Sequence, residues 1–131
     1  MTLQTWTITG ATTASSPATG INDASGQTFN VGVSTVTYTI EDAAGNSVST
    51  CSFTVTISDD EDPTITCSAD INQDSDPGVC TAAVTVVAPV TADNCGVLSV
   101  INSFNGTSDA SDTYPLGLTI ITWTVTDNSG N

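Results

Sequence analysis

The chain has 131 residues with 14 acidic side chains and no lysine, arginine or histidine, so its net charge is −14. Nucleic-acid binding is excluded because phosphate contacts need basic side chains, and an anionic membrane surface would repel the chain. Serine or cysteine nucleophiles would lack their usual bases, and most of the acids lie in turn-like contexts, not in a pattern that suggests a catalytic pair. We therefore expect a non-enzymatic protein.

Five segments, taken in chain order, alternate apolar and polar residues with the period of two that indicates a β-strand: 35–40, 51–57, 65–71, 80–86 and 121–125. No window has a helical period, and no apolar run approaches the roughly 20 residues of a membrane helix. The pattern predicts an all-β protein without membrane insertion. We expect the following residues to face inward: Val36, Tyr38, Ile40, Cys51, Phe53, Val55, Ile57, Ile65, Cys67, Ala69, Ile71, Cys80, Ala82, Val84, Val86, Ile121, Trp123 and Val125, with Trp6 also in the core.

An internal repeat relates two parts of the chain. Residues 30–46 (NVGVSTVTYTIEDAAGN) correspond to residues 115–131 (PLGLTIITWTVTDNSGN) at a distance of 85 residues. This period is too long for a solenoid and suits a whole small β-sandwich. We expect residues 1–58 to form the C-terminal half of one repeat and 59–62 an acidic junction. Residues 63–131 would form the N-terminal and middle part of the next repeat, whose last strand would follow residue 131.

Several motifs in this order resemble the hyalin repeat (HYR) family. They are residues 51–56 (CSFTVT), 63–71 (PTITCSADI), 77–80 (PGVC), 92–96 (ADNCG), 114–117 (YPLG) and 123–127 (WTVTD). The resemblance implies immunoglobulin-like antiparallel β-sandwich repeats in tandem, in an extracellular protein that serves adhesion or acts as a structural spacer.

Arrays of such repeats look similar to the long cell-surface adhesins and fibres of gliding and biofilm-forming bacteria. The expected function is therefore a structural repeat of an extracellular fibre or adhesin stalk that mediates surface attachment. Neighbouring similar repeats are the expected partners, and surface glycans or proteins are further candidates. The alternative is a carbohydrate- or protein-binding accessory module of a secreted enzyme.

Four cysteines in a small acidic β-protein suggest disulfides formed in an oxidising compartment. Zinc binding is disfavoured, because no two cysteines are close in sequence and histidine is absent. We expect Cys67 and Cys80 to pair across two neighbouring strands. Cys51 and Cys95 would each pair with a cysteine outside the chain, and a Cys51–Cys95 bond is the alternative.

Acidic residues are concentrated at the junction between the repeats. Residues 59–62 are all acidic, and two loops of the second repeat that carry Asp93 and Asp127 are expected at the same end. Such oxygen ligands suit calcium, and a bound ion would stiffen the junction. The candidate calcium ligands are Asp59, Asp60, Glu61, Asp62, Asp93 and Asp127. A solvated, flexible acidic hinge is the alternative.

One further motif, Asn105-Gly106-Thr107, fits the acceptor pattern for N-glycosylation. The pattern is short and matches often by chance. A turn centred on Gly106 explains it equally well.

Overall fold

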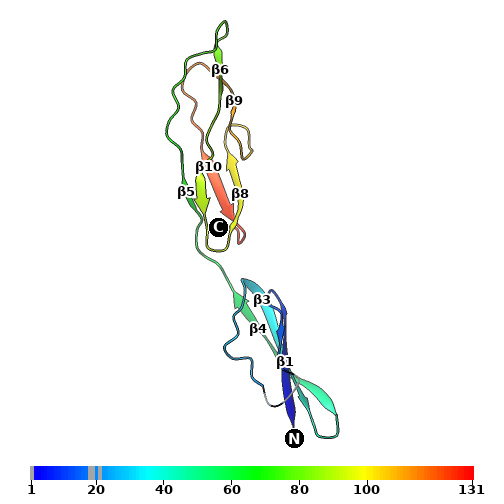
Figure 1. The fold of residues 1–131 in the computed structure, drawn as a ribbon. Coiled ribbons are helices and arrows are strands. Elements are labelled where there is room, and N and C mark those ends of the chain that lie inside the picture. The colour runs from blue at the N-terminus through cyan, green and yellow to red at the C-terminus, as the bar shows by residue number, and fades with distance from the viewer. Residues whose placement is uncertain (1, 18–19, 21) are drawn as a thin grey trace. The chain divides into compact units, whose positions relative to one another are not determined.

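The computed structural model describes residues 2–17, 20 and 22–131, and every regular element in them is a β-strand (Figure 1). The chain forms two compact units, Met1–Asp59 and Asp60–Asn131. All strand pairs are antiparallel, which confirms the predicted all-β class. No helix in the described part of the chain is long and apolar enough to cross a membrane.

The first unit is one four-stranded sheet in the order β2-β1-β3-β4 (Figure 1). Its strands are β1 (Leu3–Gly10), β2 (Ala14–Ser15), β3 (Gly32–Glu41) and β4 (Ser47–Ile57). Long β3 lies between β1 and β4 and pairs with both along almost its whole length. The alternation of β-branched and aromatic residues explains why this segment adopts an extended, pleated conformation.

Trp6, Ile8 and Val36 form the core of the first unit. Trp6 is 5% exposed, which confirms that it belongs to the core. Its indole N–H donates to the main-chain oxygen of Asp23 at 2.9 Å, so the polar end of the ring is satisfied. Ile8 and Val36 lie directly opposite each other on β1 and β3, so their side chains share one face of the sheet.

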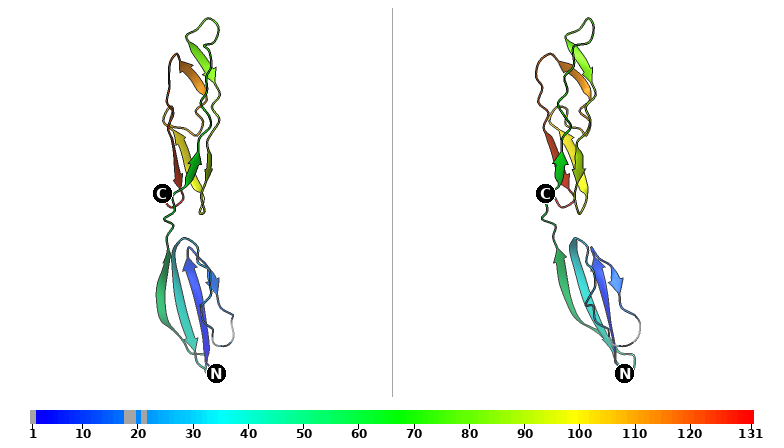
Figure 2. Two further views of the ribbon diagram at one scale, coloured as in Figure 1. Left: turned by 90° about the vertical axis from the view of Figure 1, so that its left-hand side faces the viewer. Right: turned by 60° about the vertical axis from the view of Figure 1, so that its left-hand side comes forward.

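The second unit consists of three two-stranded antiparallel sheets, β5-β7, β6-β9 and β8-β10 (Figure 2). Its core contains Ala82, Ala110 and Tyr114. The Tyr114 ring stacks on Phe104 with 4.4 Å between ring centroids. The strands are β5 (Thr64–Thr66), β6 (Thr81–Val84), β7 (Val90–Ala92), β8 (Val97–Asn102), β9 (Asp112–Pro115) and β10 (Trp123–Asp127).

The predicted inward rows are covered only in part, which corrects the expectation of closed faces. Phe53 is 47% exposed, and Ile40, Ile57, Ile65 and Ile71 are exposed as well. In the first unit, the described residues place one sheet and a few loop side chains on the core, and no second sheet covers the row on β4. Alternation therefore predicted which face is apolar but not what covers it. Four more expected inward residues, Cys51, Cys67, Ala69 and Cys80, are also exposed.

The expected Cys67–Cys80 disulfide is wrong, because these two cysteines are not bonded to each other in the structure. The Asp76 N–H donates to the main-chain oxygen of Thr81 at 2.8 Å, so the chain reverses there and Cys80 lies beside the turn. Cys67 lies about nine residues from this turn, or roughly 30 Å along an extended chain. A disulfide needs Cα atoms within about 7 Å.

The prediction was wrong about where the two cysteines lie in the hairpin that reverses at residues 76–81. Cys80 lies at the tip of this hairpin, and Cys67 lies near its open end. External partners for Cys51 and Cys95 stay a prediction.

Candidate metal centre

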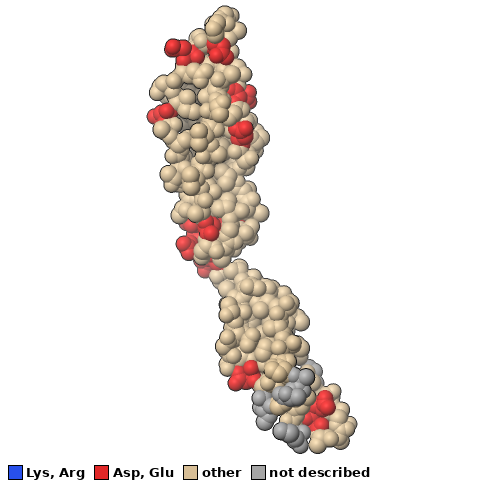
Figure 3. Space-filling model, in the orientation of Figure 1, with Lys and Arg blue, Asp and Glu red and all other residues tan. Residues whose placement is uncertain are grey.

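Acidic side chains are scattered over the surface, and a patch of them covers one end of the second unit (Figure 3). This is the end where β5 begins and where β10 ends (Figure 1). Since the sequence contains no lysine or arginine, no basic side chain of this chain can neutralise the patch. Such a surface attracts cations from solution.

Three of the six candidate ligands come together there. One carboxylate oxygen each from Asp59, Asp93 and Asp127 lies within 4.8 Å of the other two. Asp59 belongs to the segment that leads into β5, Asp93 follows β7, and Asp127 is the last residue of β10. The ends of β7 and β10 and the segment that leads into β5 therefore position the three carboxylates.

Asp127 is the fully buried member of the cluster, with 0% exposure. Its Oδ1 accepts main-chain N–H groups from Ser129 at 2.9 Å, Gly130 at 2.6 Å and Asn131 at 2.8 Å. The Asn131 side-chain amide donates to Oδ2 at 2.9 Å. Burial acts to raise the pKa of Asp127, but these hydrogen bonds outweigh it and leave the pKa below its usual value. Asp127 is therefore ionised at neutral pH.

Asp93 has one oxygen without a partner. Its Oδ1 accepts the main-chain N–H of Cys95 at 2.8 Å. Its Oδ2 is buried and has no hydrogen-bond partner among the described residues. A buried carboxylate oxygen without a donor is costly unless a cation or water approaches it.

The other three candidates do not join this cluster. Glu61 instead accepts a hydrogen bond from the Asn94 side-chain amide at 3.0 Å, and its main-chain oxygen accepts one from Asn131 at 3.3 Å. Asp60 and Asp62 are exposed. Consecutive acidic residues point in different directions on an extended segment, so four in a row cannot all face one ion.

Asparagines at this end of the unit were not recognised from the sequence as part of the site. The side-chain amide of Asn128 donates to the main-chain oxygen of Cys95 at 2.9 Å, and its main-chain N–H donates to Gly96 at 3.0 Å. These bonds fix the turn after β10 against the loop after β7. The repeated Asp-x-x-Gly-Asn pattern of residues 42–46 and 127–131 could have revealed the turn itself, but Asn128 stands at a variable position of that pattern, so the sequence carries no signal for its role.

The donor set fits a hard cation. All three grouped side chains offer carboxylate oxygen, and neither a thiolate nor an imidazole belongs to the group. Calcium takes six to eight such oxygens in a flexible geometry, so three carboxylates would supply part of its shell and main-chain oxygens or water the rest. The arrangement thus presents three carboxylate oxygens that a cation could share.

Asn105 of the possible glycosylation motif lies in a hydrogen-bonded turn. Its side-chain nitrogen, to which a glycan would be attached, donates to the main-chain oxygen of Asp109 at 2.9 Å. Its side-chain oxygen accepts from the amide of Asn102 and from Thr107. The turn interpretation therefore accounts for the motif without a glycan.

Comparison with known proteins identifies relatives along the whole chain. The HYR domain family model matches twice, at residues 5–57 and 58–131. Hyalin from Strongylocentrotus purpuratus is 34% identical over 110 residues, which cover 82% of this chain and 9% of the relative. Hyalin from Lytechinus variegatus is 34% identical over 131 residues, which cover 97% of this chain and 24% of the relative. No solved structure matches significantly.

The chain thus spans less than a quarter of the length of these relatives. Neither relative is bacterial, so they give no support to a bacterial setting. The two family matches follow each other directly and together cover nearly every residue of the chain. The chain belongs to the HYR domain family and carries two consecutive stretches of HYR repeat sequence.

Proposed function

We propose that the chain is part of an extracellular tandem-repeat protein, in which HYR repeats serve adhesion and act as structural spacers. The observation that carries this proposal is the pair of consecutive family matches. The 34% identity to each of two hyalins supports it. Further support is the composition, because a net charge of −14 on each such chain keeps a long array of repeats soluble.

A carbohydrate-binding accessory role has less support. Sugar-binding surfaces commonly present exposed aromatic rings, and Trp6 is buried in the core of the first unit. Trp123 is half-buried on β10. The proposed module therefore acts through its repeats and their neighbours.

Location is tested with an antibody raised against residues 1–131 and applied to intact and permeabilised cells that produce the protein. An extracellular repeat protein should be labelled equally in both samples, on the cell or in the surrounding matrix. Cells in which the gene is deleted should attach less to surfaces. Labelling that needs permeabilisation would contradict the extracellular proposal, and unchanged attachment would contradict the adhesive one.

We propose, in addition, that Asp59, Asp93 and Asp127 bind calcium. Their three close oxygens and the partnerless Oδ2 of Asp93 support this. A bound ion would neutralise charges that otherwise repel one another and would hold the loop after β7 to the end of β10. Calcium at about 100 times its Kd would stabilise the folded chain by roughly 2.7 kcal/mol.

The calcium proposal is tested by thermal unfolding of the chain in millimolar calcium and in a chelator. We expect a higher Tm in calcium, and loss of this increase in the Asp93→Asn variant. Asp74→Asn is the matched control, because Asp74 is an exposed acid of the same unit outside the cluster. An equal response of the two variants, or no response of the unchanged chain, would remove calcium from the proposal.

A further inference from the structure

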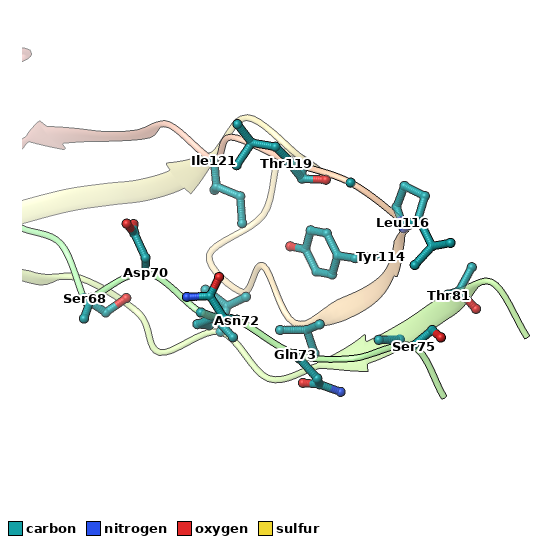
Figure 4. Close-up of a pocket in the computed structure, with 18 of the residues that line it drawn as sticks. Ser68, Asp70, Asn72, Gln73, Ser75, Thr81, Tyr114, Leu116, Thr119 and Ile121 are labelled. Atoms are coloured by element: carbon teal, nitrogen blue, oxygen red, sulfur yellow. The ribbon is translucent and has the colours of Figure 1, made fainter. Parts of the chain in front are cut away.

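A groove in the second unit has a volume of about 390 Å³, and Tyr114 and Ile121 are directed into it (Figure 4). The last strand of this repeat is expected directly after residue 131. That strand would cover the groove, because β4 holds the corresponding position beside β3 in the first unit. The groove is therefore assigned no ligand of its own.

The connection that follows β1 is longer than its counterpart in the second unit. Trp6 and Asp23 are 17 positions apart, whereas their counterparts Asn102 and Asp109 are 7 positions apart. Within this connection, residues 11–20 read ATTASSPATG, and half of them are serine or threonine. Segments rich in serine and threonine that also contain proline are typical of O-glycosylated stalks. The composition thus makes this segment a candidate for O-linked glycans.

Two of the hydroxyl groups in this segment belong to the fold. The hydroxyl oxygen of Thr12 accepts the main-chain N–H of Asn30 at 2.7 Å, and Thr12 is 8% exposed. The hydroxyl oxygen of Ser16 accepts the main-chain N–H of Trp6 at 3.0 Å. A sugar on either oxygen would disturb a bond that satisfies a main-chain donor, and such donors are costly to leave unpaired. Thr12 and Ser16 are therefore poor acceptors for a glycan.

Thr13 and Ser15 have the opposite character. Both side chains are exposed, and neither hydroxyl group is hydrogen-bonded to any of the described residues. A sugar on these oxygens would displace only water. Thr19, the remaining hydroxyl residue of the segment, lies outside the described residues.

The exposure of Ser15 follows from the direction of its side chain. Ala14, the other residue of β2, packs against the core of the first unit. Successive side chains of a strand point to opposite faces, so Ser15 is directed away from the core, on the face of Thr7, its partner on β1. The second sheet of a β-sandwich packs on the core face. Ser15 therefore stays accessible whichever strands cover the core.

We propose that Thr13 and Ser15 are acceptor sites for O-linked glycans. A separate transferase would supply a sugar carried as a diphosphate ester. The hydroxyl oxygen of the acceptor attacks the anomeric carbon, and a glycosidic C–O bond forms. The bond from that carbon to the diphosphate oxygen breaks, the diphosphate leaves with its carrier, and the hydroxyl proton passes to a base of the transferase. The inference rests on the proposed extracellular location, where such glycans would face solvent.

Two local features favour this segment as a transferase substrate. Pro17 has no N–H to donate, so it cannot lengthen the pairing of β2 with β1, and the strand stays two residues long. The acceptors thus lie in or beside a short extended piece and not within a long ladder. Residues 1–22 contain no acidic residue, although the chain has 14. A sugar diphosphate is anionic, so an acid-free segment does not repel it.

The first experiment maps the sugar on the protein isolated from the cells that produce it. A protease that cleaves before aspartate releases a peptide that ends at Asn22, because Asp23 is the first acidic residue of the sequence. We expect a mass increase that corresponds to whole sugar units, and electron-transfer fragmentation should place them on Thr13, Ser15 or both. A peptide of unmodified mass, or sugar only on other residues, would overturn the proposal.

The second experiment compares two double variants produced in the same cells. Thr13→Ala with Ser15→Ala should lose the added mass completely and unfold at an unchanged Tm, because both side chains are exposed. Thr7→Ala with Thr9→Ala is the matched control, since it removes two exposed hydroxyl groups from β1 in the same acid-free stretch. The control should keep the full added mass. Equal masses lost or kept in the two variants would overturn the assignment.

Antibody labelling of the same cells separates this inference from the proposed location. Protein labelled on intact cells with an unmodified peptide would overturn the glycan and leave the extracellular location standing. Protein labelled only after permeabilisation, with sugar on Thr13 or Ser15, would support the glycan and overturn the location.

Discussion

The same turn occurs at the end of β3 and at the end of β10, and the two copies differ in one main respect. Asp42 accepts the main-chain N–H groups of Ala44 and Asn46, and the Asn46 side chain returns a hydrogen bond to it. Asp127 makes the corresponding bonds with Ser129 and Asn131. Both pKa values are lowered, for Asp42 mainly by the Asn46 side chain.

The difference is burial. Asp42 is exposed, and Asp127 is fully buried because the neighbouring turn residue Asn128 is bonded to Cys95 and Gly96 in the loop after β7. Five consecutive residues therefore build each turn, 42–46 in the first unit and 127–131 in the second. The loop after β7 then covers the second turn, which becomes part of the candidate metal site. Like turns acquire different roles when different chain segments cover them.

The largest effect is expected from Asp127→Ala compared with Asp42→Ala. Removal of Asp127 leaves main-chain N–H groups without an acceptor in a buried place, whereas water can replace Asp42. We expect the Asp127 variant to lower the Tm on the order of 5–10 °C and the Asp42 variant by much less. Calorimetry of the two variants measures this. Equal decreases would mean that burial does not distinguish the turns.

A tyrosine pair sharpens the comparison. The Tyr114 hydroxyl donates to the main-chain oxygen of Ala110, and Ala110 is fully buried. The Tyr38 hydroxyl accepts the N–H of Ala24, which is half-buried, at 2.9 Å. In each unit a tyrosine thus fixes the middle of an Asp-Ala-Ser turn.

We expect Tyr114→Phe to cost about 1–2 kcal/mol and Tyr38→Phe about half as much, because the group left unpaired is more deeply buried in the second unit. Denaturant unfolding, with amide exchange to assign the change to a unit, checks the order. The reverse order would show that burial of the partner does not set the cost.

The smallest effect is a pH dependence. A lowered pKa in the folded state means that ionised Asp127 stabilises the protein above the unfolded-state pKa of about 3.9. This contribution is lost as the pH falls through the lower, folded-state value. The stability difference between the unchanged chain and Asp127→Asn should therefore be constant from neutral pH to about pH 5 and shrink below pH 4. A difference that grows in acid would contradict the lowered pKa.

The strand positions and the fold class could be predicted from alternation alone. β3 and β4 include the predicted segments 35–40 and 51–57, because one-sided burial imposes a period of two. Residues 65–71 and 80–86 form only the short strands β5 and β6. A strand also needs a partner edge, and the partner is a property of the fold.

Sequence by itself determined the repeat, the acidic character and the local turns, because each depends on residues close together in the chain or on composition. The tertiary structure decided which carboxylates meet. Asp93 and Asp127 are brought together with Asp59, whereas adjacent Asp60 and Asp62 are not. It also decided that Cys67 and Cys80 stay apart, since the hairpin between them places one at its tip and one at its open end. Distance along the chain limits how far apart two residues can be, and strand register then sets how close they come.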